Sequence, residues 1–68
     1  MPQSVRPEQV IKALEKDGFS FIKQRGSHKK FKKGNRTVIV PMHYELATGT
    51  LKSILEQSGL TMDKIIGK

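Results

Sequence analysis

The sequence contains no cysteine in its 68 residues. It therefore can form no disulfide and has no thiolate to hold a structural metal, which fits a reducing compartment. No apolar run approaches the ~20 residues that a transmembrane helix needs, and no signal-peptide segment is visible. We expect a cytoplasmic protein without membrane association. At this length, we expect one small domain covering residues 1–68.

Acidic residues are missing from the middle of the chain. None lies between Asp17 and Glu45, whereas seven of the thirteen lysines and arginines do, and the whole chain carries a net charge of +7. A basic stretch of this kind predicts contact with the phosphate backbone of a nucleic acid. An anionic partner protein or a solubilising surface would explain it equally well, because charge alone does not identify the anion.

Several familiar catalytic patterns are also missing. We find no glycine-rich phosphate loop, no pair of closely spaced carboxylates and no Ser-His-Asp arrangement. The two histidines, His28 and His43, make a poor zinc site because structural zinc usually takes four ligands, commonly including cysteine. We therefore expect neither a metal nor a cofactor.

The remaining sequence predicts two helices around three short strands. RPEQVIKALEKDGF fits a helix with Pro7 at its first position and Gly18 just past its end. GTLKSILEQSGL fits a second helix, with Thr48 as a candidate N-cap and Gly59 as its stop. TMDKIIGK could add one terminal turn capped by Thr61. Strands are expected at about 19–25, 28–33 and 36–40, which gives an α+β fold, α-β-β-β-α, with both helices on one face of a three-stranded antiparallel sheet.

The turn residues predict the strand pairing. A two-residue turn at Gly34-Asn35 pairs Phe31 with Val38, and both point toward the helices. A turn at Gly26-Ser27 pairs Ile22 with Phe31. The opposite, open face then carries Lys23, Arg25, His28, Lys30 and Lys32.

This pairing leaves Phe21 pointing outward. Its ring is then either a stacking surface for a base or a sign that the first register is shifted.

The segment QRGSHKKF places His28 among lysines. A neutral imidazole can accept a proton at pH 7, and the 2′-hydroxyl of RNA offers one beside the scissile phosphate. Its removal would let the oxygen attack the phosphorus and leave a 2′,3′-cyclic phosphate and a 5′-hydroxyl. Neighbouring lysines would stabilise the developing charge, and the Gly26-Ser27 backbone could approach a phosphate closely. The simpler alternative is that His28 is one more exposed surface residue.

A second acid–base group is not identified by the sequence. It could be His43, a lysine, Tyr44 or water. His43, in VPMHYE, could also contact a base or make a structural hydrogen bond.

Four segments together resemble the HicA-type toxins, which are small messenger-RNA interferases of bacterial and archaeal toxin–antitoxin pairs. These are LEKDGF, QRGSHKKF, VIVPMH and GTLKSILEQSGL, in the family's order and over nearly the whole chain. The resemblance implies a double-stranded-RNA-binding-domain-like fold and a type II toxin with metal-independent endoribonuclease activity on mRNA. It also implies an essential histidine, which is His28 here, and a HicB-type antitoxin that covers the active surface. Many members carry a second histidine where this chain has Lys29.

We therefore predict His28 as the catalytic residue. The residues predicted to bind RNA are Lys23, Arg25, Gly26, Ser27, Lys29, Lys30, Lys32 and His43. The alternatives are a non-catalytic RNA-binding module with a basic sheet face and a module that receives an acidic protein.

Overall fold

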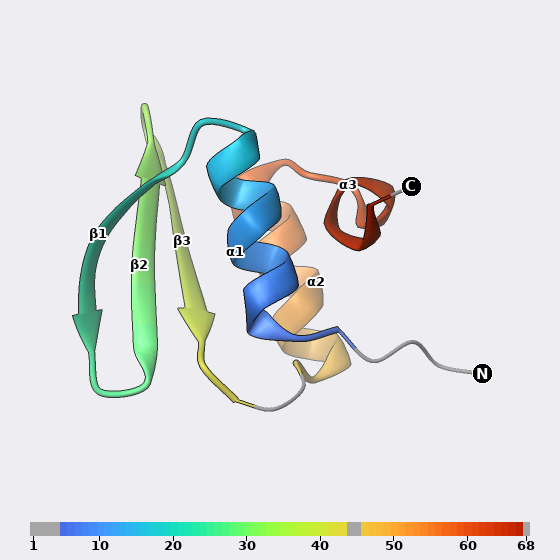
Figure 1. Ribbon diagram of the computed structural model, residues 1–68, viewed down its shortest axis with the longest axis horizontal. Helices are drawn as coiled ribbons and strands as arrows, with labels where there is room; N and C mark the ends of the chain where they lie inside the picture. Colours follow the sequence, from blue (N-terminus) through green and yellow to red (C-terminus); the bar gives the residue numbers. More distant parts are fainter. Residues whose placement is uncertain (1–4, 44–45, 68) are drawn as a thin grey trace.

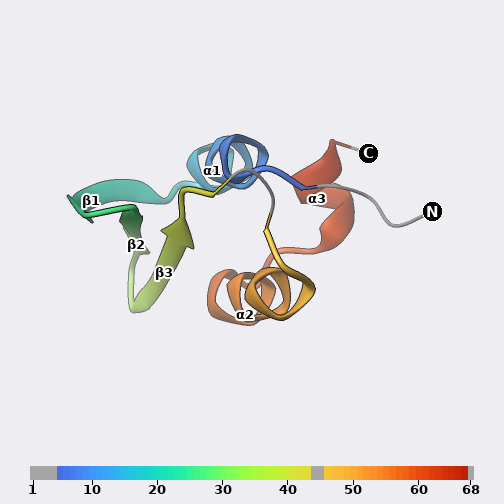
Figure 2. The same cartoon turned by 90° about the horizontal axis from the view of Figure 1, so that it is seen from below.

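The computed structural model describes residues 5–43 and 46–67. The elements in chain order are α1 (Pro7–Lys16), β1 (Ser20–Arg25), β2 (His28–Lys33), β3 (Arg36–Pro41), α2 (Thr48–Ser58) and α3 (Met62–Ile66). The strands form one antiparallel sheet in the order β1-β2-β3. Both α1 and α2 lie beside β3, while β1 is farthest from the helices (Figures 1 and 2). The predicted α+β fold is confirmed.

Helix α1 begins where the sequence predicts. Pro7 is its first residue, a position where the missing backbone N–H costs no hydrogen bond. The N–H of Arg6, just before it, donates to Gln9 Oε1 at 2.8 Å. The chain leaves the helix through Gly18, whose φ of +100° is a conformation that glycine adopts without steric cost.

The two C-terminal helices differ from the prediction at one cap. Ala47, and not Thr48, is the N-cap of α2, so Thr48 begins the helix itself. Gly59 ends α2 as predicted, and its N–H donates to the carbonyl oxygen of Leu55 at 2.8 Å. Thr61 caps α3 with its side-chain oxygen, which confirms the predicted terminal turn.

The hydrophobic core lies between one face of the sheet and the helices. Phe31 of β2 and Val38 and Val40 of β3 are almost fully buried. Helix side chains pack against them, above all Leu14 and Ile54. The rest of the core consists of Val5, Val10, Ala13, Phe19, Leu46, Leu60 and Ile65. Because side chains alternate along a strand, burying this face exposes the other one.

The β2–β3 hairpin has the predicted register. Phe31 pairs with Val38 and Lys29 pairs with Val40 across the turn at Gly34-Asn35.

The prediction of the β1–β2 register is correct only near the turn that joins the two strands. Phe21, and not Ile22, pairs with Phe31, because a bulge lies between Phe21 and Lys23. The predicted Ile22–Phe31 pair was therefore wrong. The bulge inserts one extra residue into an edge strand that the helices do not cover, and Phe21 can then pack its ring edge-on against Phe31, with ring centres 5.7 Å apart. Phe21 thus belongs to the face of Phe31, not to the open face.

Two isoleucines provide a matched test of this core. Ile54 is 1% exposed and Ile22 is 48% exposed. Removing one buried methylene should make Ile54→Val less stable by about 1 kcal/mol. The same change at Ile22 should alter the free energy of unfolding by less than about 0.5 kcal/mol. Urea unfolding of both variants measures this difference, and equal losses of stability would contradict the described core.

Candidate active site

The turn between β1 and β2 sets the position of His28. Gly26 has a φ of +59°, which suits glycine at the first position of a type II′ turn. Gln24 Nε2 donates to the Gly26 carbonyl oxygen at 2.8 Å. His28 is the first residue of β2 after this turn and pairs with Arg25 across the hairpin.

A backbone hydrogen bond brings the end of β3 to the same turn. The N–H of Met42 donates to the carbonyl oxygen of Ser27 at 2.6 Å. His43 follows directly, and its ring centre lies 6.4 Å from that of His28, with the ring planes at 65°. The two histidines of the chain therefore share one corner of the sheet, and both are exposed.

The open face of the sheet contains a shallow depression beside His28. Its lining residues are Lys23, Arg25, His28, Lys30 and Ile39. The strand register explains the grouping, because Lys30 lies between Lys23 of β1 and Ile39 of β3. The structure thus brings together four of the nine residues predicted for the site.

Ile39 is the member of this depression that the sequence prediction missed. Its side chain is 38% exposed, although isoleucine is usually buried. The sequence did contain the information to place Ile39 on the open face. Val38 and Val40 on either side of it were expected to point inward, and the side chains of a strand alternate between its faces.

The other predicted residues lie around the depression or behind it. Lys32 is also on the open face, two residues beyond Lys30 along β2, and it pairs with Thr37 of β3. Gly26 and Ser27 form the exposed turn. Lys29 is half-buried and shares the face of Phe31, so the structure separates it from His28. Tyr44, an alternative acid–base group, lies outside the described residues.

Intramolecular partners occupy only part of the basic stretch. Lys33 Nζ forms a salt bridge with Asp17 Oδ2 at 3.1 Å, and Arg36 Nη1 donates to the Gln57 carbonyl oxygen at 3.2 Å. Within residues 5–43 and 46–67, no side-chain hydrogen bond or salt bridge involves Lys23, Arg25, Lys29, Lys30 or Lys32. The charges of the open face are thus available to an anion.

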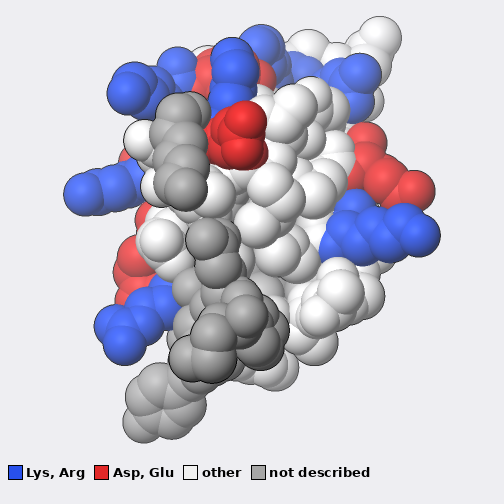
Figure 3. All heavy atoms as spheres, turned by 90° about the vertical axis from the view of Figure 1, so that its right-hand side faces the viewer, with Lys and Arg blue, Asp and Glu red and all other residues white. Residues whose placement is uncertain are grey.

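Charge is distributed unevenly between sheet and helices. The strands β1, β2 and β3 contain no acidic residue, whereas α1, α2 and α3 each contain at least one. On the side of the molecule that α3 occupies, acidic and basic groups alternate around an uncharged centre (Figure 3). On the strands, the positive charges of the open face are therefore not offset by acidic residues of the same elements.

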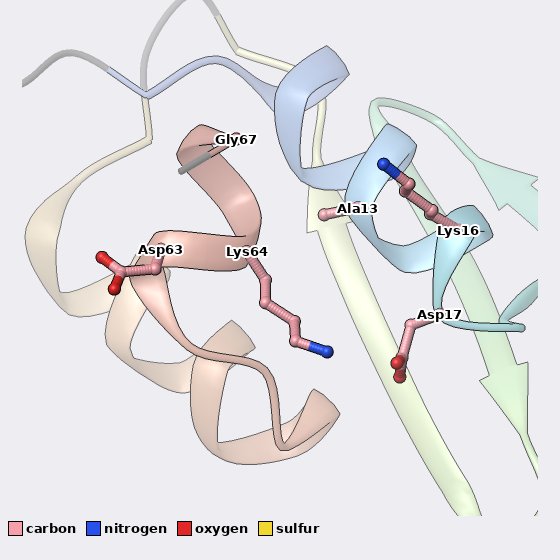
Figure 4. Close-up of a pocket in the computed structure, with 6 residues that line it drawn as sticks. All are labelled: Ala13, Lys16, Asp17, Asp63, Lys64 and Gly67. Carbon is pink, nitrogen blue, oxygen red and sulfur yellow. The ribbon is translucent and has the colours of Figure 1, made fainter.

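Another hollow lies between α1 and α3, away from the histidines. It is lined by Ala13, Lys16, Asp17, Asp63, Lys64 and Gly67, and Lys64 reaches from α3 toward Asp17 (Figure 4). None of the predicted site residues lines it, and its Asp17 is engaged by Lys33.

Two further features bear on cofactors and membranes. In the described part of the chain, no three His, Cys, Asp or Glu side chains come together in a group able to hold a metal ion. No helix among the described residues is long and apolar enough to cross a membrane.

Comparison with known proteins identifies the family. The model of the HicA toxin family of bacterial toxin–antitoxin systems matches residues 7–60. The match begins at the first residue of α1 and ends after α2, so it contains the whole sheet, both histidines and the open face. A search of curated proteins finds no match. Because the family model covers most of the chain, the protein belongs to the HicA family of toxins of toxin–antitoxin systems.

Proposed function

We propose that this toxin is an endoribonuclease that cleaves mRNA, with His28 as a catalytic acid–base residue. One observation carries the proposal: His28 is exposed in a depression that it shares with Lys23, Arg25 and Lys30. A proton acceptor beside three cations suits a phosphodiester, whose cleavage requires proton transfer and builds negative charge on phosphorus-bound oxygens.

The cleavage would proceed by attack of the RNA on itself. The 2′-hydroxyl loses its proton to a base, and its oxygen forms a bond to the adjacent phosphorus. The bond from phosphorus to the 5′-oxygen breaks, and that oxygen takes up a proton. The products are a 2′,3′-cyclic phosphate and a 5′-hydroxyl. The reaction as written calls for no redox partner and no metal ion.

The rest of the open face would hold the RNA chain. Lys32 extends the row of cations along β2, and the backbone of Gly26 and Ser27 lies exposed beside His28. Ile39 adds an apolar contact that suits a base or a ribose. Lys29 lies on the opposite face of the sheet and takes no part in this surface.

A toxin of this family has an antitoxin partner. We propose a HicB-type antitoxin whose acidic surface covers the open face and thereby blocks access to His28. The charge pattern supports this arrangement, because the acid-free strands offer the best electrostatic match to an acidic partner.

Replacement of His28 tests the catalytic proposal. His28→Ala should slow cleavage of mRNA by about 10²- to 10⁴-fold, the usual contribution of a positioned acid–base group. Cleavage is measured by gel electrophoresis with excess EDTA, and circular dichroism confirms that the variant is folded. Lys52→Ala, an exposed change on α2, provides the control and should retain the wild-type rate.

Two results would count against this proposal. Undiminished cleavage by His28→Ala would remove His28 from the chemistry. A folded wild-type protein that cleaves none of several messenger RNAs, but binds them, would instead indicate a non-catalytic RNA-binding module.

The salt dependence of RNA binding tests the role of the lysines. In the slowly cleaving His28→Ala background, with binding measured before cleavage becomes appreciable, the logarithm of the affinity should fall linearly with the logarithm of the salt concentration. Adding Lys30→Gln should reduce that slope by about 0.7, the value for one lost contact with a single-stranded phosphate. Adding Lys52→Gln should leave it unchanged. Equal slopes for the two lysine variants would place RNA elsewhere on the molecule.

A further inference from the structure

The two histidines lie close enough to act on one phosphodiester. We propose that His43 is the second acid–base group of the site, working in concert with His28: one imidazole takes the proton from the 2′-hydroxyl, and the other gives a proton to the leaving 5′-oxygen. This inference rests on the proposed ribonuclease function.

The fold, not the sequence spacing, creates this pair. Fifteen positions separate His28 from His43, but Pro41 pairs with His28 across β2 and β3. The hydrogen bond from the Met42 N–H to the Ser27 carbonyl oxygen, at 2.6 Å, then continues the contact one residue beyond the strand. The two residues before His43 are therefore both held against the turn that carries His28.

The separation of the rings suits a phosphate group between them. Hydrogen bonds from imidazole nitrogen to oxygen are about 3 Å long. Two of them, one from each ring to a different oxygen of the same phosphodiester, fit rings whose centres lie 6.4 Å apart. The planes are inclined at 65°, so the two rings do not stack on each other. Both side chains are exposed, so RNA can reach each of them from solvent.

The chemistry also calls for two groups. The base must be neutral and the acid must carry a proton, and the two act on different oxygens in the same step. A single imidazole cannot hold both states at once. With two, the base ends the step protonated and the acid ends it neutral, and exchange with water restores the pair. Imidazole is the side chain that exchanges protons most readily near pH 7, whereas the lysines of the depression suit charge stabilisation.

Different charged groups surround the two rings. Lys23, Arg25 and Lys30 line the depression of His28. A second hollow, which His43 lines and His28 does not, is formed by Arg6, Pro7, Glu8, Met42 and His43. Because the step needs one neutral base and one protonated acid, the wild-type rate should be bell-shaped in pH, with one limb for each group.

A substrate with a modified leaving group separates the two roles. In an oligoribonucleotide whose 5′-bridging oxygen is replaced by sulfur, the thiolate leaves without receiving a proton. On ordinary RNA, His43→Ala and His28→Ala should each slow single-turnover cleavage by about 10²- to 10⁴-fold. On the sulfur substrate, the variant that lacks the acid should regain most of the wild-type rate, and the variant that lacks the base should not. The variant that lacks the acid should also lose one limb of the pH–rate profile.

Controls keep the failure of each proposal distinct. His43→Gln, which retains a polar side chain of similar size, should behave as His43→Ala does, and Lys52→Ala should match the wild type. If the wild type cleaves RNA and the His43 variants cleave it equally fast, the pair is wrong while the ribonuclease proposal stands. If His28→Ala and His43→Ala are both slow on ordinary RNA and both stay slow on the sulfur substrate, the proposed acid–base pair is also wrong. If the folded wild type cleaves neither substrate, both proposals fall.

Discussion

The burial of Phe31 is the constraint on which the site depends. This residue is 2% exposed and packs between the sheet and the helices. Side chains of a strand alternate between its faces, so placing Phe31 inside forces His28, Lys30 and Lys32 to the outside. A slip of one residue would exchange the two faces and bury the charges. The large cost of burying unpaired charges therefore disfavours such a slip and keeps these residues on the open face.

The sequence was sufficient to predict most of this architecture because its signals were local. Proline at the start of α1, glycine after α2 and glycine-containing turns in both hairpins each specify a backbone conformation. The alternation along β2 and β3 then assigned the open face, including His28 and Lys30. Ile39 followed from the same alternation but was overlooked.

The features that sequence reasoning missed depend on tertiary context. The bulge after Phe21 arises in an edge strand that no helix covers, where the ring gains an edge-on contact with Phe31. A turn motif cannot predict an extra residue several positions away. The approach of His43 to His28 likewise depends on the backbone hydrogen bond from Met42 to Ser27, which lies beyond the end of β3. Sequence suggested both histidines, and only the fold places them together.

The division of charge links the fold to the toxin's partners. The strands carry cations without acids, and the helices carry both. Of the basic residues in the middle of the chain, Lys33 and Arg36 serve structural contacts at the far end of the sheet. The cations near His28 are left to bind a ligand. Our proposal gives this one surface two ligands, RNA when the toxin is free and an acidic antitoxin when it is held inactive.

The most direct test of this account is the chemical identity of the ends left by cleavage, measured by mass spectrometry of a short RNA cut once. Attack by the 2′-hydroxyl predicts a 2′,3′-cyclic phosphate on one fragment and a 5′-hydroxyl on the other. It also predicts that the same RNA with a 2′-O-methyl group at the scissile nucleotide stays intact. A 3′-hydroxyl and a 5′-phosphate, or cleavage of the methylated RNA, would contradict the assignment of the histidine-lined corner as the site of RNA self-cleavage.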